Sequence, residues 1–126
     1  MSLNVFLSGF VAGEPSAHGG AQMREVLAPH ITNENWPFLL VRVGDGEAAL
    51  MLFEPRMMVT HISGRDPWDL LVRGARAANW IIRPAGGPIF LTQPGQLEEL
   101  PAELNDKVVV VFVESGADLL AVIESR

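Results

Sequence analysis

The chain contains no cysteine among its 126 residues. This excludes disulfide bonds, zinc–thiolate sites and a thiol nucleophile, and it agrees with a reducing compartment. No strictly apolar run is longer than Val108–Val113, which is much too short to cross a bilayer. No basic segment precedes the first apolar residues, so a signal peptide is not expected. These absences predict a soluble cytoplasmic protein without a membrane partner.

Positive charge is also scarce, since 9 Lys and Arg face 15 Asp and Glu and give a net charge of −6. Residues 56–83 are the exception, with two acids and five arginines. Binding to nucleic acid irrespective of sequence depends on neutralising phosphates, so an acidic chain is a poor candidate for it. A basic protein surface is a more plausible partner.

The motifs of metal, nucleotide and hydrolytic sites are missing as well. The three histidines, His18, His30 and His61, lack the spacing of zinc sites, so no metal is predicted. There is no GKS/GKT, GxGxxG or GxSxG motif, so neither a cofactor nor a nucleophile elbow is predicted. His61 and Ser63 share a face of one predicted strand and are the candidates for a pocket.

The length and the hydrophobic fraction of 48% predict one globular domain over residues 1–126. Two apolar runs, Phe38–Val43 and Ala48–Phe53, flank Asp45-Gly46, which predicts a β-hairpin with a type I′ turn. Arg56–Ile62 is expected to be a third strand with strictly alternating faces. The predicted class is α+β, with a mixed, mostly antiparallel sheet of about five to seven short strands and three or four short helices.

The stretch Asp66–Leu100 is the most clearly patterned part of the chain. Asp66 suits an N-cap and Pro67 the first turn of a helix over 67–78, whose buried stripe begins at Trp68. A strand over 80–83, a Gly/Pro turn, a returning strand over 89–91 and a short helix are expected to follow. The strand at 56–62, the helix and the strand at 80–83 together predict a βαβ unit.

The two ends of the chain are less distinctive. Apolar residues from Leu3 to Val11 at helical spacing favour a helix, with a strand over Asn4–Leu7 as the alternative. A short helix is predicted at Ala21–Ala28, followed by a polar turn at Thr32–Trp36. Val108–Val113 is expected to be a central strand, because it is apolar throughout. Residues 118–123 are a strand or a terminal helix, and the strand is favoured.

The segment Leu70–Leu100 is similar to the N-terminal domain of the SseB family, named for enhanced serine sensitivity and also annotated in type III secretion. The likeness lies in an alanine-rich helix end at Arg73–Ala78, an apolar strand, the turn Pro84–Gly87, a second strand and a short helix with Leu97 and Leu100. The resemblance implies a mixed α/β domain in a non-enzymatic or uncharacterised role.

Two groups of side chains are candidates for an interaction surface. One is a patch of arginines with a nearby tryptophan, formed by Arg56, Arg65, Arg73, Arg76, Arg83 and Trp68. Arginine next to aromatic rings is a common arrangement for holding anionic ligands. The other is an apolar group formed by Trp36, Phe38, Met51, Met57 and Met58. Methionine-rich surfaces adapt to protein partners.

The sequence therefore predicts a non-catalytic protein-interaction or adaptor domain, with either a different protein or a second copy as its partner. The binding surface would be the sheet region 38–62 or the arginine patch. One alternative is a small enzyme or ligand-binding protein with a pocket at His61, and the sequence does not identify a small-molecule ligand. A further alternative is an acidic inhibitor or immunity-type protein that masks a basic partner.

Overall fold

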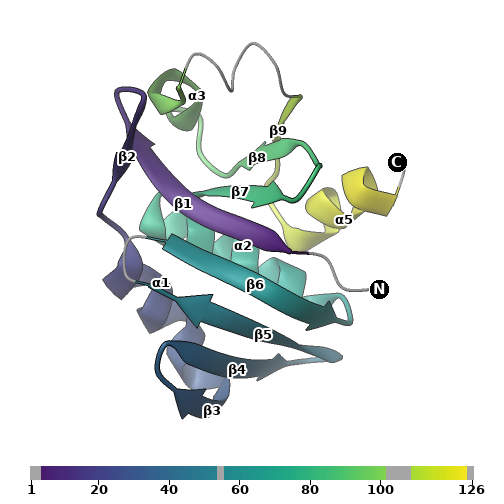
Figure 1. Cartoon of the computed structure of the whole chain (residues 1–126). Helices are drawn as coiled ribbons and strands as arrows, with labels where there is room; N and C mark the ends of the chain where they lie inside the picture. The colour runs from purple at the N-terminus through teal and green to yellow at the C-terminus, as the bar shows by residue number, and fades with distance from the viewer. Residues whose placement is uncertain (1–3, 54–55, 102–108, 125–126) are drawn as a thin grey trace.

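A nine-stranded sheet organises the chain (Figure 1). The computed structural model describes residues 4–53, 56–101 and 109–124. The strands follow the order β3-β4-β5-β6-β1-β7-β8-β9, and β2 pairs separately with β1. Neighbouring strands are antiparallel except β8 and β9, which are parallel. The strands are β1 Val5–Val11, β2 Glu14–Ser16, β3 Ile31–Asn35, β4 Phe38–Val43, β5 Gly46–Leu52, β6 Arg56–Ser63, β7 Ile81–Pro84, β8 Ile89–Leu91 and β9 Val110–Phe112.

The helices lie mainly on one side of this sheet. The described α-helices are α1 Gly20–Leu27, α2 Asp66–Ala78, α3 Gln96–Glu99 and α5 Gly116–Glu124, with a 3-10 helix η1 at Ala28–His30. α1 and α2 pack together behind the sheet, and α5 packs against α2 (Figure 1). The described part contains no helix with the length and apolar character needed to span a membrane. The α+β class is confirmed, but the sheet has more strands than the five to seven predicted.

β1 lies inside the sheet, so the helix favoured from Leu3 to Val11 is wrong over the described residues 4–11, and the alternative, a strand, is found there. Leu3 lies outside the described residues. β6 and β7 flank β1, and both are antiparallel to it. Val5 and Leu7 are fully buried, whereas Phe6 between them is 37% exposed. This is the period of two of a strand. The apolar residues from Leu3 to Val11 also satisfy helical spacing. Pairing with β6 and β7, which are distant in the sequence, selects the strand.

β4 and β5 form the predicted hairpin, joined by a two-residue turn. Its central residues are Gly44 and Asp45 rather than Asp45 and Gly46, and of these two only Gly44 has a positive φ, of 55°. A type I′ turn needs positive φ at both central positions, so the predicted turn type is wrong. Positive φ at both central positions occurs instead in the turn between β1 and β2, where φ is 52° at Ala12 and 82° at Gly13.

Two neighbouring segments show how pairing modifies the sequence pattern. The predicted polar turn at Thr32–Trp36 is largely β3, a mostly exposed edge strand paired with β4. β6 confirms the predicted third strand, but a bulge at Thr60 adds one residue relative to β5. Ile62 therefore packs on the core side with Val59 instead of facing outward with Met58, which corrects the strict alternation predicted.

α2 and the strand after it confirm the pattern predicted within Asp66–Leu100. Pro67 occupies the first turn, and the helix ends at Asn79, whose φ of 58° is left-handed. The predicted stripe from Trp68 to Ala78 is buried. β6 and β7 are both antiparallel to β1 and hence parallel to each other. α2 connects them as a βαβ unit, with β1 inserted between its two strands.

The C-terminal segment is the helix α5, and the strand favoured at 118–123 is wrong. The hydroxyl of Ser115 accepts the Asp118 N–H at 3.2 Å, and the Asp118 carboxylate accepts the Glu114 N–H at 3.0 Å. These bonds satisfy backbone donors at the helix start. β9 lies at the edge of the sheet, so it is not the central strand predicted over Val108–Val113. Val108 lies outside the described residues.

Apolar clusters lie on both faces of the sheet. The larger one fills the space between the sheet and the helices and includes the fully buried Trp80 and Phe90. The smaller one contains Ile89, Leu91 and Leu100 next to α3. Since Ile89 and Leu91 flank Phe90 along β8, the smaller cluster is on the opposite face. The segment around α3 therefore covers that face at the β7–β8 end.

Gln96 fastens this segment to the sheet, and its side chain is almost fully buried. Its carbonyl oxygen accepts the N–H of Thr92 at 2.8 Å and that of Gln93 at 3.2 Å. Its amide nitrogen donates to the Trp80 carbonyl oxygen at 3.0 Å and to Oδ1 of Asn79 at 3.2 Å. One buried amide thus joins α3 to the end of α2 and to β7.

Candidate binding face

The sheet surface opposite α1 and α2 is not covered by a described helix over β4, β5, β6 and the first half of β1, whereas α3 packs near Phe10 in its second half. In Figure 1 these strands lie in front of both helices. We call this surface the open face. Alternation along the strands, together with strand register, places on it Phe6, Ser8, Phe38, Leu40, Arg42, Glu47, Ala49, Met51, Arg56, Met58, Thr60, His61, Ser63 and, from β7, Arg83.

A row of four apolar side chains crosses the open face. Phe38 is the register partner of Met51, Met51 of Met58, and Met58 of Phe6. Phe38 is 55% exposed and Phe6 is 37% exposed, while the two methionines are half-buried. Register partners lie about 5 Å apart, so the four form a continuous apolar strip about 15 Å long. Contiguous apolar surface with a polar rim is typical of interaction sites.

Three hollows open onto the same face. The first, of about 250 Å³, extends from β3 to β6 and has Asn35 and Thr60 among its polar lining groups. The second, of about 190 Å³, lies over β1 and is lined by Phe6, Met58 and two arginines. The third, of about 320 Å³, adjoins the second and reaches Ser16 on β2. The open face therefore combines apolar area with recesses that hold polar groups.

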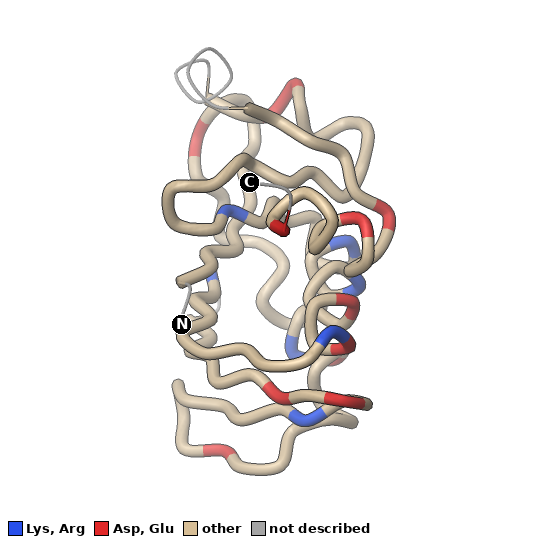
Figure 2. Tube along the Cα trace, turned by 90° about the vertical axis from the view of Figure 1, so that its right-hand side faces the viewer, with Lys and Arg blue, Asp and Glu red and all other residues tan. Residues whose placement is uncertain are grey.

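The predicted arginine patch is divided between two sides of the molecule. Arg56 and Arg83 lie on the open face, on the two strands that flank β1. Arg65, Arg73 and Arg76 lie on the helical side, and Trp68 is buried in the core. Arg65 forms an ion pair with Glu124 at 3.5 Å, and Arg73 forms one with Asp69 at 3.8 Å. Arg76 donates to the carbonyl oxygens of Thr92 and Glu114. Figure 2, in which the open face points left, shows most charged segments on the helical side.

The structure does not bring His61 and Ser63 into a catalytic arrangement. Both are exposed on β6, and within the described ranges the His61 ring has no hydrogen-bond partner. A general base must lie within hydrogen-bond reach of the group that it deprotonates. Nor does the described part of the chain contain a group of three His, Asp or Glu side chains placed to hold a metal ion.

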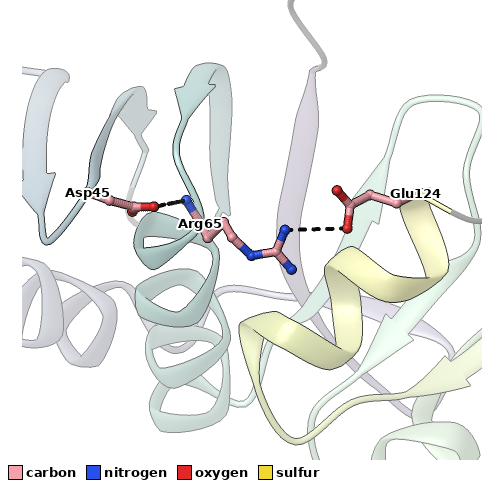
Figure 3. A network of polar contacts seen from close by, with 3 residues as sticks. All are labelled: Asp45, Arg65 and Glu124. Atoms are coloured by element: carbon pink, nitrogen blue, oxygen red, sulfur yellow. Dashed lines mark hydrogen bonds and ion pairs between the residues drawn. The ribbon is translucent and has the colours of Figure 1, made fainter.

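Asp45 caps α2 from the neighbouring hairpin, a role that the sequence interpretation assigned to Asp66. Its carboxylate accepts the N–H of Asp66 at 2.9 Å and that of Arg65 at 3.0 Å, while the Asp45 N–H donates to Asp66 Oδ2 at 3.1 Å. The bond from the Asp66 N–H, followed by that from Arg65, lowers the pKa of Asp45. In Figure 3, Asp45 and Glu124 approach Arg65 from two sides, so this network links the hairpin, α2 and α5.

Phe6 and Ser8 belong to the open face, although the sequence interpretation gives them no role. It places them on a helix, where they would not share a face. No local signal separates a helix from a strand here, because Val5, Phe6 and Leu7 are all apolar.

The open face offers apolar contact area, guanidinium groups, hydroxyls and side-chain amides. These groups suit recognition of another molecule. At the edge of the third hollow, the Ser16 hydroxyl is hydrogen-bonded to Nδ1 of His18. No known family model and no curated protein matches this chain.

Proposed function

We propose that the chain is a non-catalytic protein-interaction domain that binds its partner through the open face. The observation that carries this proposal is the apolar row from Phe38 to Phe6, which is uncovered although the opposite face of the same strands is packed against helices. Covering each half-exposed phenylalanine would contribute about 1 kcal/mol to binding, a fraction of the value for full burial. The adaptable Met51 and Met58 lie at the centre of the row.

The other roles considered from the sequence have less support in the geometry. A pocket enzyme would need a partner for His61, which is exposed. An acidic inhibitor would need an acidic binding face, but the charged groups of the open face are mainly arginines. The resemblance of Leu70–Leu100 to the SseB family remains a proposal, and it agrees with a non-enzymatic role.

Methionine methyl groups provide a direct test of the binding surface. The protein would be labelled with ¹³C at the methionine methyl groups and titrated with peptides selected on it from a random displayed library. Met51 and Met58 report on the open face, whereas Met23 and Met57 are buried and serve as internal controls. We expect bound peptides to shift the first pair of signals and to leave the second pair nearly unchanged.

A matched pair of substitutions completes the test. Phe38 and Phe112 have similar exposed fractions, 55% and 52%, but Phe112 lies on β9 near the opposite edge of the sheet. Phe38→Ser should weaken peptide binding at least tenfold, and Phe112→Ser should leave it unchanged. Selected peptides that bind without shifting Met51 or Met58, or that are equally sensitive to both substitutions, would refute the proposal.

A further inference from the structure

The arginines of this protein differ in whether an acidic side chain pairs with them. Arg24, Arg65 and Arg73 each form an ion pair with an acidic side chain. Arg56 and Arg83 form no ion pair within the described part of the chain, and Arg56 instead lies over the ring of Phe53 at 5.8 Å. Both line the hollow over β1. In a chain with a net charge of −6, unpaired arginines that share one hollow are an unusual concentration of positive charge.

The strand register brings these two arginines to a common point. Arg83 is paired with Phe6, and Arg56 is paired with Ser8, two residues further along β1. With strands spaced about 4.8 Å apart and a rise of about 3.3 Å per residue, their Cα atoms lie about 12 Å apart across β1. The long side chains can therefore converge over Ser8 and Phe6. A carboxylate placed there would meet two guanidinium groups, which bind carboxylates through forked hydrogen bonds.

We propose that the occupant of the open face is an acidic, extended segment of a partner protein. This inference rests on the function proposed above and specifies the chemistry of the partner. An Asp or Glu of the segment pairs with Arg56 and Arg83, and its apolar side chains pack on Phe6, Met58 and their neighbours in the row. The strip of about 15 Å corresponds to four or five extended residues at about 3.3 Å per residue.

A second copy of this chain fits the open face less well. Arg42, Arg56 and Arg83 lie on it, and Glu47 is the acidic side chain among the residues placed there. Two open faces packed against each other would juxtapose positive charge with positive charge, and like charges across an interface oppose association. An acidic segment provides the complementary charge.

The test uses three labelled peptides whose sequences differ only in one residue type: DDLLDDLL, NNLLNNLL and KKLLKKLL. In an extended peptide this order places both residue types on each face. Binding to the full chain would be measured by fluorescence anisotropy at 50 and 300 mM salt. We expect the aspartate peptide to bind at least tenfold more tightly than the asparagine peptide, and its affinity to fall as salt rises. The lysine peptide should bind most weakly.

Substitutions at exposed arginines separate local recognition from a general charge effect. The double variant R56Q/R83Q should lose at least tenfold in affinity for the aspartate peptide. The double variant R65Q/R73Q removes the same two charges from the helical side and should change affinity less than twofold. Met51 and Met58 methyl shifts in each variant establish whether a peptide still reaches the open face.

The outcomes distinguish this inference from the function on which it rests. Equal binding of the aspartate and asparagine peptides at the open face, unaffected by R56Q/R83Q, would overturn the acidic partner and leave the interaction domain intact. Peptides that fail to perturb Met51 and Met58 would overturn both. A dimer in sedimentation that buries these methionines would identify a second copy as the occupant and also overturn the inference.

Discussion

Replacing Gln96 with alanine should destabilise the protein much more than a surface substitution. The substitution removes the acceptor of the buried Thr92 N–H, which then has no partner in the described structure. An orphaned buried donor costs about 1–3 kcal/mol. The bond from the Gln96 amide to the Trp80 carbonyl, at 3.0 Å, is lost as well, although Thr92 Oγ1 still donates to that carbonyl. The second loss adds about 0.5–1.5 kcal/mol, so we expect a total of about 2–4 kcal/mol.

Urea unfolding followed by circular dichroism would measure this loss, with Gln22→Ala as the control. Gln22 is an exposed glutamine in α1 and should change the free energy of unfolding by less than about 0.5 kcal/mol. Hydrogen exchange should also show faster exchange across residues 92–101, because Gln96 anchors α3. If the Gln96 variant unfolds within about 0.5 kcal/mol of the control, the network does not fasten this segment and the reasoning is wrong.

Two further predictions concern contacts at α2. A Cβ added at Gly116 would lie 2.6 Å from the Asp69 Cα, so Gly116→Ala should lower the free energy of unfolding by about 1–3 kcal/mol in thermal denaturation. Gly95→Ala has open space and is the control; similar losses in both would contradict this packing. Because the pKa of Asp45 is lowered on folding, its ionised form stabilises the native state above the ordinary aspartate pKa of about 3.9. This contribution to the free energy of unfolding is lost as pH falls through the pKa of Asp45 in the folded state. Asp45→Asn should therefore be less stable than the parent at pH 7, with the difference in urea midpoint vanishing at low pH; a difference that persists in acid would refute this.

The elements predicted correctly are those whose signals are local. The hairpin at Phe38–Leu52 and the helix at 67–78 depend on a turn and on an amphipathic stripe within a few residues of each other. β1 was mistaken because its stripe fits two periods, and the strands that decide between them come much later in the sequence. α5 had a local signal that was missed: Ser115 and Asp118 have the spacing of a capping box.

The residues that share the open face were predicted in part. The region 38–62 contributes Phe38, Met51 and Met58 to the open face, as the sequence interpretation suggested, whereas Met57 is buried. The arginine patch could not be sorted from the sequence, because nearness along the chain does not reveal which side of the sheet a side chain occupies. Arg56 and Arg83 come together through β1, a strand that precedes both of them in the sequence.

The insertion of β1 between β6 and β7 also determines the order in which the sheet can be completed. During synthesis, β1 leaves the ribosome first, but its two neighbours are the segments 56–63 and 81–84. The meander from β4 to β6 can pair as soon as it is made, whereas β1 is left with only β2 and with unburied Val5 and Leu7. Pairings of such long sequence separation form slowly and expose apolar surface in the interval. β1 therefore has both neighbours only once Pro84 has been made, and its insertion joins the two halves of the sheet.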